Sequence, residues 1–400
     1  MFDVRETYNI RPFMHRVLVL ALGAFALGLD AYVMAGLLPT IAGDLHVSLP
    51  AAGQLVTAFT LCYALAAPVF ATVLSGKMAR PVLAAALVVF TIANALSALA
   101  NSFPLLLATR AVAGLGAGLY SPLAVAAAAS LVPARQRGRG LALVMGGMST
   151  GVVLGVPAGL ALASYAGWRS TLWLVTALGT LTLAGLLAWL PTIPTVAPPS
   201  IRQRLSMLMD GRVASVVGVS FLAAVASLGL YTYLVPVLGV AGSHATPYFL
   251  TWGMGGVVGS FGIGSLLDRT SRPFMLVACI LGTMALAMLL LPVLAPSTTV
   301  LIPLAFWGAA GWALQVPQQH TLLTARPDHG TVAVAINGSA LYLGSAVGSA
   351  LGGTVLSSGM RVSLLPVLAG GIAFSALILH LAVTWFHQLR TRPHLPEKPD

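Results

Sequence analysis

The polar residues of this chain gather in short segments that separate about twelve long apolar runs. Most of these runs reach the roughly 20 residues that a helix needs to cross the hydrocarbon core of a bilayer. They are too long, and alternate too little between apolar and polar positions, to be strands of a membrane barrel. The pattern therefore predicts an all-α membrane protein with twelve transmembrane helices. The expected spans are residues 17–38, 51–75, 82–100, 104–131, 141–165, 170–190, 213–239, 247–267, 274–293, 298–323, 330–357 and 363–386.

One long connection divides the predicted helices into two groups of six. Residues 191–212 begin with the stretch PTIPTVAPPS, which is too rich in proline to form a continuous helix, and end with IRQRLSMLMDGR. The second stretch is basic and amphipathic, which suits a short helix on the membrane surface. We predict an N-terminal six-helix bundle over residues 1–190, a linker over residues 191–212 and a C-terminal six-helix bundle over residues 213–400.

The two halves repeat one another weakly. The loop LSGKMARP, which begins at Leu74, has a counterpart LLDRTSRP that begins at Leu266. The glycines of the stretch GVVLGVPAG, which begins at Gly151, recur at almost the same offset in the stretch that begins at Gly344. Duplicated, pseudo-symmetric halves are typical of secondary transporters, which bind their substrate between the repeats near the middle of the membrane.

Composition supports a membrane protein, and the charges predict its orientation. Hydrophobic residues make up 58% of the chain and charged residues 7%, whereas a soluble domain has about 25% charged residues. The net charge is +11, and all basic residues except Arg110, Arg169 and Arg361 fall on the side where both termini lie. The positive-inside rule then places both termini in the cytoplasm. We therefore interpret the basic charge as an orientation signal beside the lipid bilayer and expect no nucleic-acid partner.

Asp30 is an acidic residue inside a long apolar run, VLVLALGAFALGLDAYVMAGLL, in which nothing else is charged. A carboxylate in the middle of a bilayer costs roughly 2.5–3.5 kcal/mol on insertion scales, and such a residue usually binds or carries something. Burial penalises the charged form of a carboxyl group, so Asp30 is suited to take up and release a proton. The alternative is a structural role, as a helix cap or in a hydrogen bond between helices.

Arg110 is the candidate electrostatic partner of Asp30. It lies about six residues into the fourth predicted span, while Asp30 lies about eight residues from the far end of the first. At 1.5 Å per residue these positions correspond to similar depths, roughly 9 and 12 Å below one membrane surface. We expect a direct or water-mediated pair that protonation of Asp30 would release. The alternative is that Arg110 extends towards the membrane surface.

Several motifs together resemble the major facilitator superfamily, and most closely its twelve-span drug:proton antiporters with their sugar-efflux and chloramphenicol-efflux relatives. The motifs are the two repeated loops, Arg110-xxx-Gly114-x-Gly116-x-Gly118, the Gly151 stretch, VPARQRGR from Val132, and Gly167-Trp168-Arg169. The resemblance covers nearly the whole chain and implies the major facilitator fold. It also implies a proton-coupling role for an acidic residue on the first helix, here Asp30, and for the arginine at position 110.

The resemblance implies conformational roles for two further groups of residues. Gly151, Gly155, Pro157 and Gly159 match the pattern associated with antiporters, and we expect their face to contact a helix of the other half closely; the alternative is ordinary tight packing. In the family the repeated loops form a charged latch. The second copy keeps Gly264, but the first has Gly76 where an acid is expected. The charged residues assigned to the latch are Lys77, Arg80, Asp268, Arg269 and Arg272.

Polar, sulfur and aromatic residues within the spans are candidates to contact a substrate. Met34 lies one helical turn from Asp30 and shares its face. A cavity of aromatic surface with a few amides suits small amphipathic solutes, although helix packing is an equal alternative for each residue. The candidates are Tyr32, Met34, Gln54, Tyr63, Asn94, Tyr120, Tyr231, Tyr233, Gln315, Gln318, Asn337 and Tyr342.

These observations predict a proton-coupled transporter of the inner membrane that exports drug-like amphipaths such as amphenicols. Sugar or nucleoside efflux, or import by the same fold, are the alternatives. We expect a monomer whose partners are a small-molecule substrate, protons and lipid, with no cofactor and no metal. An enzyme is not expected: Gly147-Met148-Ser149-Thr150-Gly151 matches a nucleophile elbow but lacks the strand-turn-helix context. A channel fits the repeated halves and the buried acid less well than alternating access.

Overall fold

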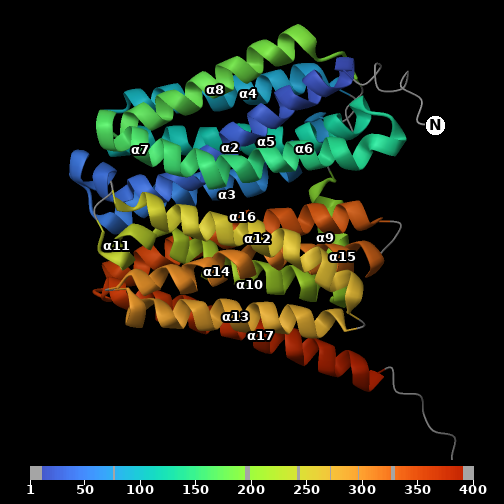
Figure 1. The fold of residues 1–400 in the computed structure, drawn as a ribbon. Helices are drawn as coiled ribbons and strands as arrows, with labels where there is room; N and C mark the ends of the chain where they lie inside the picture. The colour runs from blue at the N-terminus through green and yellow to red at the C-terminus, as the bar shows by residue number, and fades with distance from the viewer. Residues whose placement is uncertain are drawn as a thin grey trace, which may run out of the picture.

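The computed structural model describes residues 11–74, 77–193, 199–240, 244–270, 272–295, 297–325 and 329–390. Twelve helices within these ranges are long and apolar enough to cross a membrane, which confirms the predicted fold class (Figure 1). The first half contains α2 (Arg11–Asp44), α3 (Leu49–Leu74), α4 (Ala79–Leu99), α5 (Phe103–Leu131), η1 (Ala134–Gln136), α6 (Arg137–Thr150), η2 (Gly151–Gly155), α7 (Val156–Ala166) and α8 (Trp168–Trp189). The second contains α10 (Gly211–Thr232), α11 (Leu234–Leu238), α12 (Thr246–Arg269), α13 (Pro273–Leu294), η4 (Thr298–Val300), α14 (Leu301–Ala313), α15 (Gln315–Ala325), α16 (Gly330–Ser357), η6 (Val362–Leu364) and α17 (Leu365–Arg390).

Two spans that we predicted as continuous helices are broken by proline. The predicted span 213–239 divides into α10 and α11, and the predicted span 298–323 divides at Leu314 into α14 and α15. A proline inside a helix cannot donate to the carbonyl four residues earlier, and its ring clashes with that carbonyl. Four residues before Pro236 is Thr232, and four before Pro317 is Ala313. These are the residues at which α10 and α14 end.

The fifth span contains a short π-helix. Residues 137–166 form α6, the π-helical η2 and α7, and the N–H of Val156 donates to the carbonyl of Gly151 five residues earlier. Pro157 begins the following turn and has no N–H to give to Val153. A single wider turn accommodates this missing bond, and such turns occur inside α-helices, often at functional sites.

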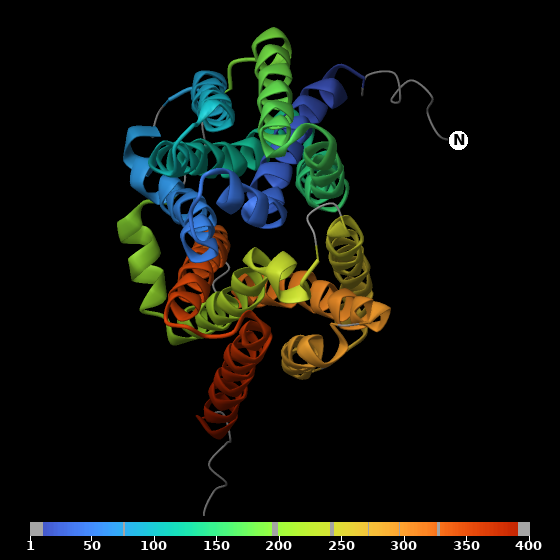
Figure 2. The same ribbon diagram turned by 90° about the vertical axis from the view of Figure 1, so that its left-hand side faces the viewer.

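The two halves form separate bundles with the same internal pairing. In Figure 1 the blue-to-green N-terminal bundle lies above the yellow-to-red C-terminal bundle, and Figure 2 shows the two groups from their end. In the first bundle α2 packs on α6, α3 on α5 and α4 on α8; in the second α10 packs on α16, α12 on α14 and α13 on α17. The α2 start and the α17 end lie on one side of the molecule, which we call the terminal side.

The linker carries the short helix α9 (Ile201–Leu208), whereas residues 194–198 of its proline-rich part lie outside the described residues. We expected α9 to lie on the membrane surface, but one of its arginines is held within the protein. Arg204 is buried and donates from Nη1 to the carbonyl of Ala335 at 3.0 Å and to Oγ of Ser339 at 2.7 Å. The linker is thereby anchored to α16 on the terminal side.

The glycines of the fifth span contact α2 of their own half, so our expectation of a contact with the other half was wrong. A Cβ atom added to Gly151 would lie 2.2 Å from the carbonyl oxygen of Phe25. Gly155 and Gly159 likewise approach Leu29. In the C-terminal bundle, Gly344 and Gly348 pack on α10 in the same way. Small residues let membrane helices approach closely, and here they hold the first and fifth helices of each half together.

Different elements join the halves, mainly towards the side opposite the termini. Oγ of Ser349 on α16 donates to the carbonyl of Gly53 on α3 at 3.0 Å. On the other flank, Gly253 of α12 lies against Val153 of η2. These contacts close the molecule on the side opposite the termini.

Candidate functional site

Asp30 and Arg110 form a buried ion pair, as their depths in the sequence suggested. Nη1 of Arg110 donates to Oδ1 of Asp30 at 2.7 Å. The exposed fraction is 0% for the carboxylate and 1% for the guanidinium, so Arg110 does not extend to the membrane surface. Asp30 lies in the interior of α2, far from either end, which excludes a helix cap. The pair is therefore a charged site inside the N-terminal bundle.

Asn94 and Phe59 complete the surroundings of the pair. Nδ2 of Asn94 donates to Oδ2 of Asp30 at 3.3 Å, and Oδ1 of Asn94 accepts from Nη1 of Arg110 at 3.1 Å. The guanidinium also lies over the ring of Phe59, 4.5 Å from its centroid. We had placed Asn94 among the substrate contacts, but the structure places it between the two charges. If Asp30 were protonated, Arg110 would still have an amide oxygen and an aromatic face as partners.

The glycines around Arg110 explain how α5 brings it to this position. Gly114 and Gly118 lie directly against the α3 backbone at Phe59 and Tyr63, and Gly116 lies against the α4 backbone at Phe90. Any side chain at these positions would push the helices apart. The sequence Arg-xxx-Gly-x-Gly-x-Gly therefore fits α5 tightly between α3 and α4, one turn from Arg110.

The helix α2 presents different residues to its own bundle and to the other half. Residues two apart on a helix point in nearly opposite directions. Asp30 faces the bundle interior, whereas Tyr32 contacts the other half, with its ring centroid 5.5 Å from that of Tyr231 and 6.2 Å from that of Trp252. Met34 is buried on the Asp30 side, so it lies away from the cavity described next. One helix thus connects the ion pair to the interface between the halves.

A cavity of about 460 Å³ lies between the two bundles. Trp252 lies nearest its end opposite the termini, and Met145 and Gln319 lie nearest the terminal side, as the directions of their helices show. None of the described residues that line it is charged. They are Tyr32, Met145, Met148, Ser149, Val152, Ala223, Ala224, Ser227, Leu228, Trp252, Ser260, Met284, Gly311, Trp312, Leu314, Gln315, Val316, Gln319, Leu341 and Tyr342.

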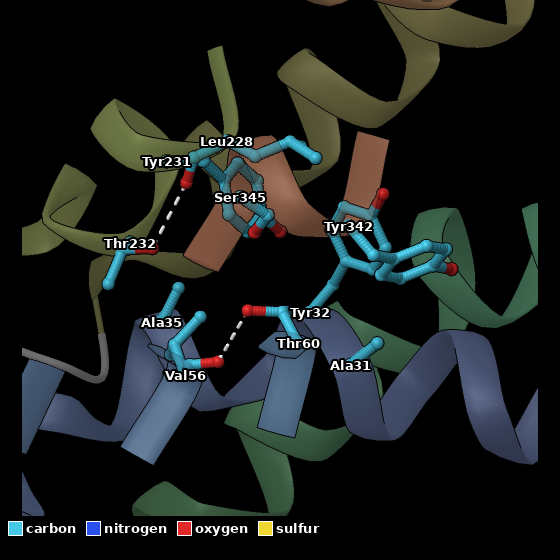
Figure 3. A pocket seen from close by; sticks show the side chains of 10 residues that line it. All are labelled: Ala31, Tyr32, Ala35, Val56, Thr60, Leu228, Tyr231, Thr232, Tyr342 and Ser345. Carbon is cyan, nitrogen blue, oxygen red and sulfur yellow. Dashed lines mark hydrogen bonds between the residues drawn. The ribbon is translucent and has the colours of Figure 1, made fainter. Parts of the chain in front are cut away.

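A second, smaller cavity of about 20 Å³ adjoins this one and shares Tyr32, Leu228 and Tyr342 with it (Figure 3). Helices of both halves line it, and Figure 3 shows the Thr60 and Thr232 hydroxyls bonded to carbonyls of their own helices. A space of this size holds about one water molecule. The Tyr32 ring therefore stands at the boundary between the large cavity and a narrow space beyond it.

The structure separates the predicted substrate residues into two groups. Tyr32, Gln315 and Tyr342 line the large cavity, and Tyr231 lines the small one. Two more touch cavity residues: Tyr63 stacks on Tyr342 with centroids 3.6 Å apart, and Asn337 donates to Gln315 at 3.4 Å.

The remaining candidates lie outside both cavity walls, and the polar ones make hydrogen bonds within or between helices. The Tyr120 hydroxyl donates to the carbonyl of Leu20 at 3.1 Å, and that of Tyr233 donates to the carbonyl of Ser349 at 2.9 Å. Gln54 and Gln318 reach backbone carbonyls at 3.5 Å. Tyr120, Tyr233 and Gln318 thus bond to another helix, and Gln54 bonds within its own. Met34 and Asn94 belong to the N-terminal bundle.

Several cavity residues were missed by the sequence analysis. Trp252 and Trp312 form part of the wall, with ring centroids 6.0 Å apart. One signal was available: Met145, Met148, Ser149 and Val152 follow the spacing i, i+3, i+4, i+7 that marks one helix face. No comparable pattern marks the two tryptophans.

The five charged loop residues assigned to the latch form no ion pair within the described ranges. Lys77, Asp268 and Arg269 are exposed, and Arg80 donates to the carbonyl of Leu187 in its own half. The N–H of Arg272 donates to Thr270. Gly76, where the family pattern has an acid, lies outside the described residues.

Known proteins resemble this chain over most of its length. The sequence model of the Major Facilitator Superfamily matches residues 20–332. The inner membrane transport protein YdhP of Escherichia coli O157:H7 is 34% identical over 373 residues, which cover 91% of this chain and 94% of that protein. A chloramphenicol resistance protein of Streptomyces lividans is 31% identical over 373 residues, covering 90% and 94% respectively. A point mutant of the nucleoside transporter NupG shares the fold, with a TM-score of 0.75 and 12% identity over 92% of this chain and 98% of that one.

Proposed function

This chain belongs to the Major Facilitator Superfamily, and from that premise we propose that it is a proton-coupled transporter that exports small, drug-like organic molecules by alternating access. Its family and fold are those of membrane transporters rather than of enzymes. The observation that carries the proposal is the buried ion pair between Arg110 of α5 and Asp30 of α2, the helix that also lines the cavity between the halves.

The proton would be carried by the Asp30 carboxyl group. Charged Asp30 holds Arg110 directly, at 2.7 Å, and the pair is neutral as a whole. Protonation would remove this attraction and leave the positive charge of Arg110 unpaired. The Asn94 amide oxygen and the Phe59 ring would then stabilise that charge. The two protonation states therefore favour different positions of α2 relative to α4 and α5. Because both charges are fully buried in this conformation, proton exchange would require the surrounding helices to move.

The same movement would reach the solute site through Tyr32. This residue lies two positions from Asp30 and contacts Tyr231 and Trp252 of the other half. A shift of α2 would change how the halves meet at the closed side. Alternating access would then follow, with the cavity facing one side when Asp30 is charged and the other after it has been protonated.

The direction of transport and the class of solute are part of the proposal. The chloramphenicol resistance protein among the relatives favours export of a drug-like amphipath, with sugar or nucleoside efflux, or import, as the alternatives. We further propose that both termini lie in the cytoplasm, consistent with the basic loops on the terminal side. The cavity would then face the cytoplasm in this conformation, ready to load an exported solute. Protons would be the coupling ion, and a monomer without cofactor would suffice.

Transport into inverted membrane vesicles tests this proposal. An imposed pH gradient, acidic inside, should drive chloramphenicol accumulation by the wild-type protein and not by Asp30→Asn. The same variant should still exchange labelled for unlabelled chloramphenicol at equal pH, because exchange requires no proton movement.

A control is needed because Asp30→Asn leaves Arg110 without its counter-ion. Asp30→Asn combined with Arg110→Met removes both charges and should be stable yet uncoupled. Accumulation by Asp30→Asn at the wild-type level, driven by the pH gradient, would exclude Asp30 as the proton carrier. Uptake into intact cells would instead identify an importer.

A further inference from the structure

The chemistry of the cavity wall defines the solute more narrowly than the family does. Building on the proposed function, we infer that the large cavity binds an uncharged aromatic molecule that carries a hydrogen-bond acceptor. Three features of the wall support this inference: none of the described residues that line it is charged, aromatic rings of both halves line it, and Gln319 offers it an amide group.

The absence of charge disfavours an ionic solute. No Asp, Glu, Lys, Arg or His lines the described cavity wall. Asp30 and Arg110 neutralise each other on the far side of α2, so neither can serve as a counter-ion. A buried charge is tolerated when it is paired or well solvated by hydrogen bonds. This cavity offers an ammonium or carboxylate group neither an opposite charge nor a dense polar shell.

The aromatic rings favour a flat solute. Trp312 lies edge-on to Trp252 with centroids 6.0 Å apart, and the Tyr32 centroid lies 6.2 Å from that of Trp252. These residues come from α2, α12 and α14, so rings from both halves line the same cavity. Aromatic rings pack in offset or edge-to-face arrangements at such distances. Met145, Met148 and Met284 complete the wall with flexible side chains that adapt to varied shapes.

One amide group of this wall can donate a hydrogen bond to a solute, whereas the buried indole groups cannot. Trp252 is 1% exposed, and its Nε1 has no hydrogen-bond partner among the described residues. Trp307, by contrast, donates to Oγ of Ser227 at 2.7 Å. Both indole N–H groups are enclosed by protein, so neither is open to a solute in this conformation. Gln319 lines the same cavity and can supply an amide donor and acceptor.

Three compounds with one skeleton test the inference. Chloramphenicol is a neutral nitroarene amide, its deacylated base carries an ammonium group at pH 7, and its hemisuccinate carries a carboxylate. Binding of each to the full-length protein in detergent is measured by titration calorimetry against protein-free micelles. We expect the neutral amide to bind at least tenfold more tightly than either ion. Equal or tighter binding of an ion, or no binding of any of the three, would overturn the inference.

Substitutions locate the binding in this cavity. Trp312→Leu removes an aromatic ring from the cavity wall, so it should weaken chloramphenicol binding roughly three- to tenfold; Trp173→Leu, on an exposed face of α8, is the matched control. Gln319→Glu adds a carboxyl group of the same size to the wall. It should raise the affinity for the ammonium compound relative to the neutral amide. Melting temperatures within a few degrees of wild type would confirm that the variants fold, and unchanged selectivity in folded Gln319→Glu would contradict the inference.

Binding and transport separate this inference from the proposed function. If chloramphenicol binds as expected but a pH gradient does not move it, proton-driven export is wrong and the inference about the cavity stands. If a pH gradient drives transport of the charged compounds instead, export is supported and the inference fails.

Discussion

At the scale of single residues, the stability of the protein depends on keeping Asp30 and Arg110 together. Removing one member of a buried ion pair leaves an uncompensated charge and typically lowers folding stability by about 3–5 kcal/mol. Replacing both members with uncharged groups can leave stability almost unchanged. The pair in this chain has no solvent to compensate for a lost partner, because both side chains are buried.

We therefore expect strong non-additivity between substitutions at the two positions. Arg110→Met alone should lower the free energy of unfolding by about 3–5 kcal/mol, and adding Asp30→Asn should restore most of it. Thermal unfolding of the single and double variants in one detergent measures this coupling. Additive effects would mean that the two charges are stabilised separately, for example by water.

The sequence identified the two charges of this site but not its third member. Asp30 and Arg110 were found because charges are rare in apolar runs, and a rare residue can be recognised without knowing its neighbours. Asn94 was one of several amides in the spans, and only the packing of α4 against α2 and α5 shows that it bridges the pair. The cavity tryptophans were missed because tryptophan is common in membrane helices and its orientation depends on tertiary packing.

At the scale of the helices, contacts of glycine with backbone decide which helices move together. Gly147 and Gly151 bring the carbonyls of Ala21 and Phe25 on α2 within about 2.3 Å of where a Cβ atom would be. A contact with rigid backbone leaves no room for a side chain. The pair α2 and α6 should therefore behave as a single body, and α10 and α16 should do so in the other half.

A pair of alanine substitutions in the fifth span tests this packing. Gly151→Ala forces α2 away and should destabilise the protein by about 1–3 kcal/mol, the usual range for overpacking. Gly146→Ala, in the same span with no atom within 4 Å of the added Cβ, should be neutral or slightly stabilising. Melting temperatures of the two variants provide the comparison, and equal values would show that α2 yields easily.

The helices themselves were largely predictable, and their irregularities were not predicted. Long apolar runs gave all twelve spans because the thickness of the bilayer imposes a length on them. The breaks after Thr232 and Ala313 follow from Pro236 and Pro317, a signal present in the sequence that a count of apolar residues ignores. The π-helical turn at Gly151–Gly155 accommodates Pro157, but proline alone does not select a π-turn over a break such as those at Thr232 and Ala313.

At the scale of the whole molecule, the duplicated halves leave their main opening between them. The closed side is held by Ser349 against Gly53 and by the aromatic contacts of Tyr32, while the cavity lies towards the terminal side. The repeated loops and glycines in the sequence predicted two similar bundles. They could not predict which side is closed, because both conformations use the same residues.

Exchange of protons for an uncharged solute has an electrical consequence. Each proton that enters brings one positive charge, and a neutral solute that leaves takes none away. A membrane potential should therefore drive transport as well as a pH gradient does, at about 2.3 kcal/mol per charge for 100 mV. In proteoliposomes at equal pH, a potassium potential set with valinomycin should drive chloramphenicol uptake. Dependence on the pH gradient with no response to potential would indicate that the solute carries compensating charge.

The wide turn in the fifth span has a geometric effect on the contact with α2. Gly147, Gly151, Gly155 and Gly159 are spaced by four, and in a regular helix each such step drifts around the axis by about 40°. The i→i+5 turn at η2 takes up part of this drift, so all four glycines still face α2. The seam between the two helices can therefore continue past the depth of Asp30. A displacement of α2 at Asp30 would then be transmitted along this seam to Met145 and Met148 in the wall of the large cavity.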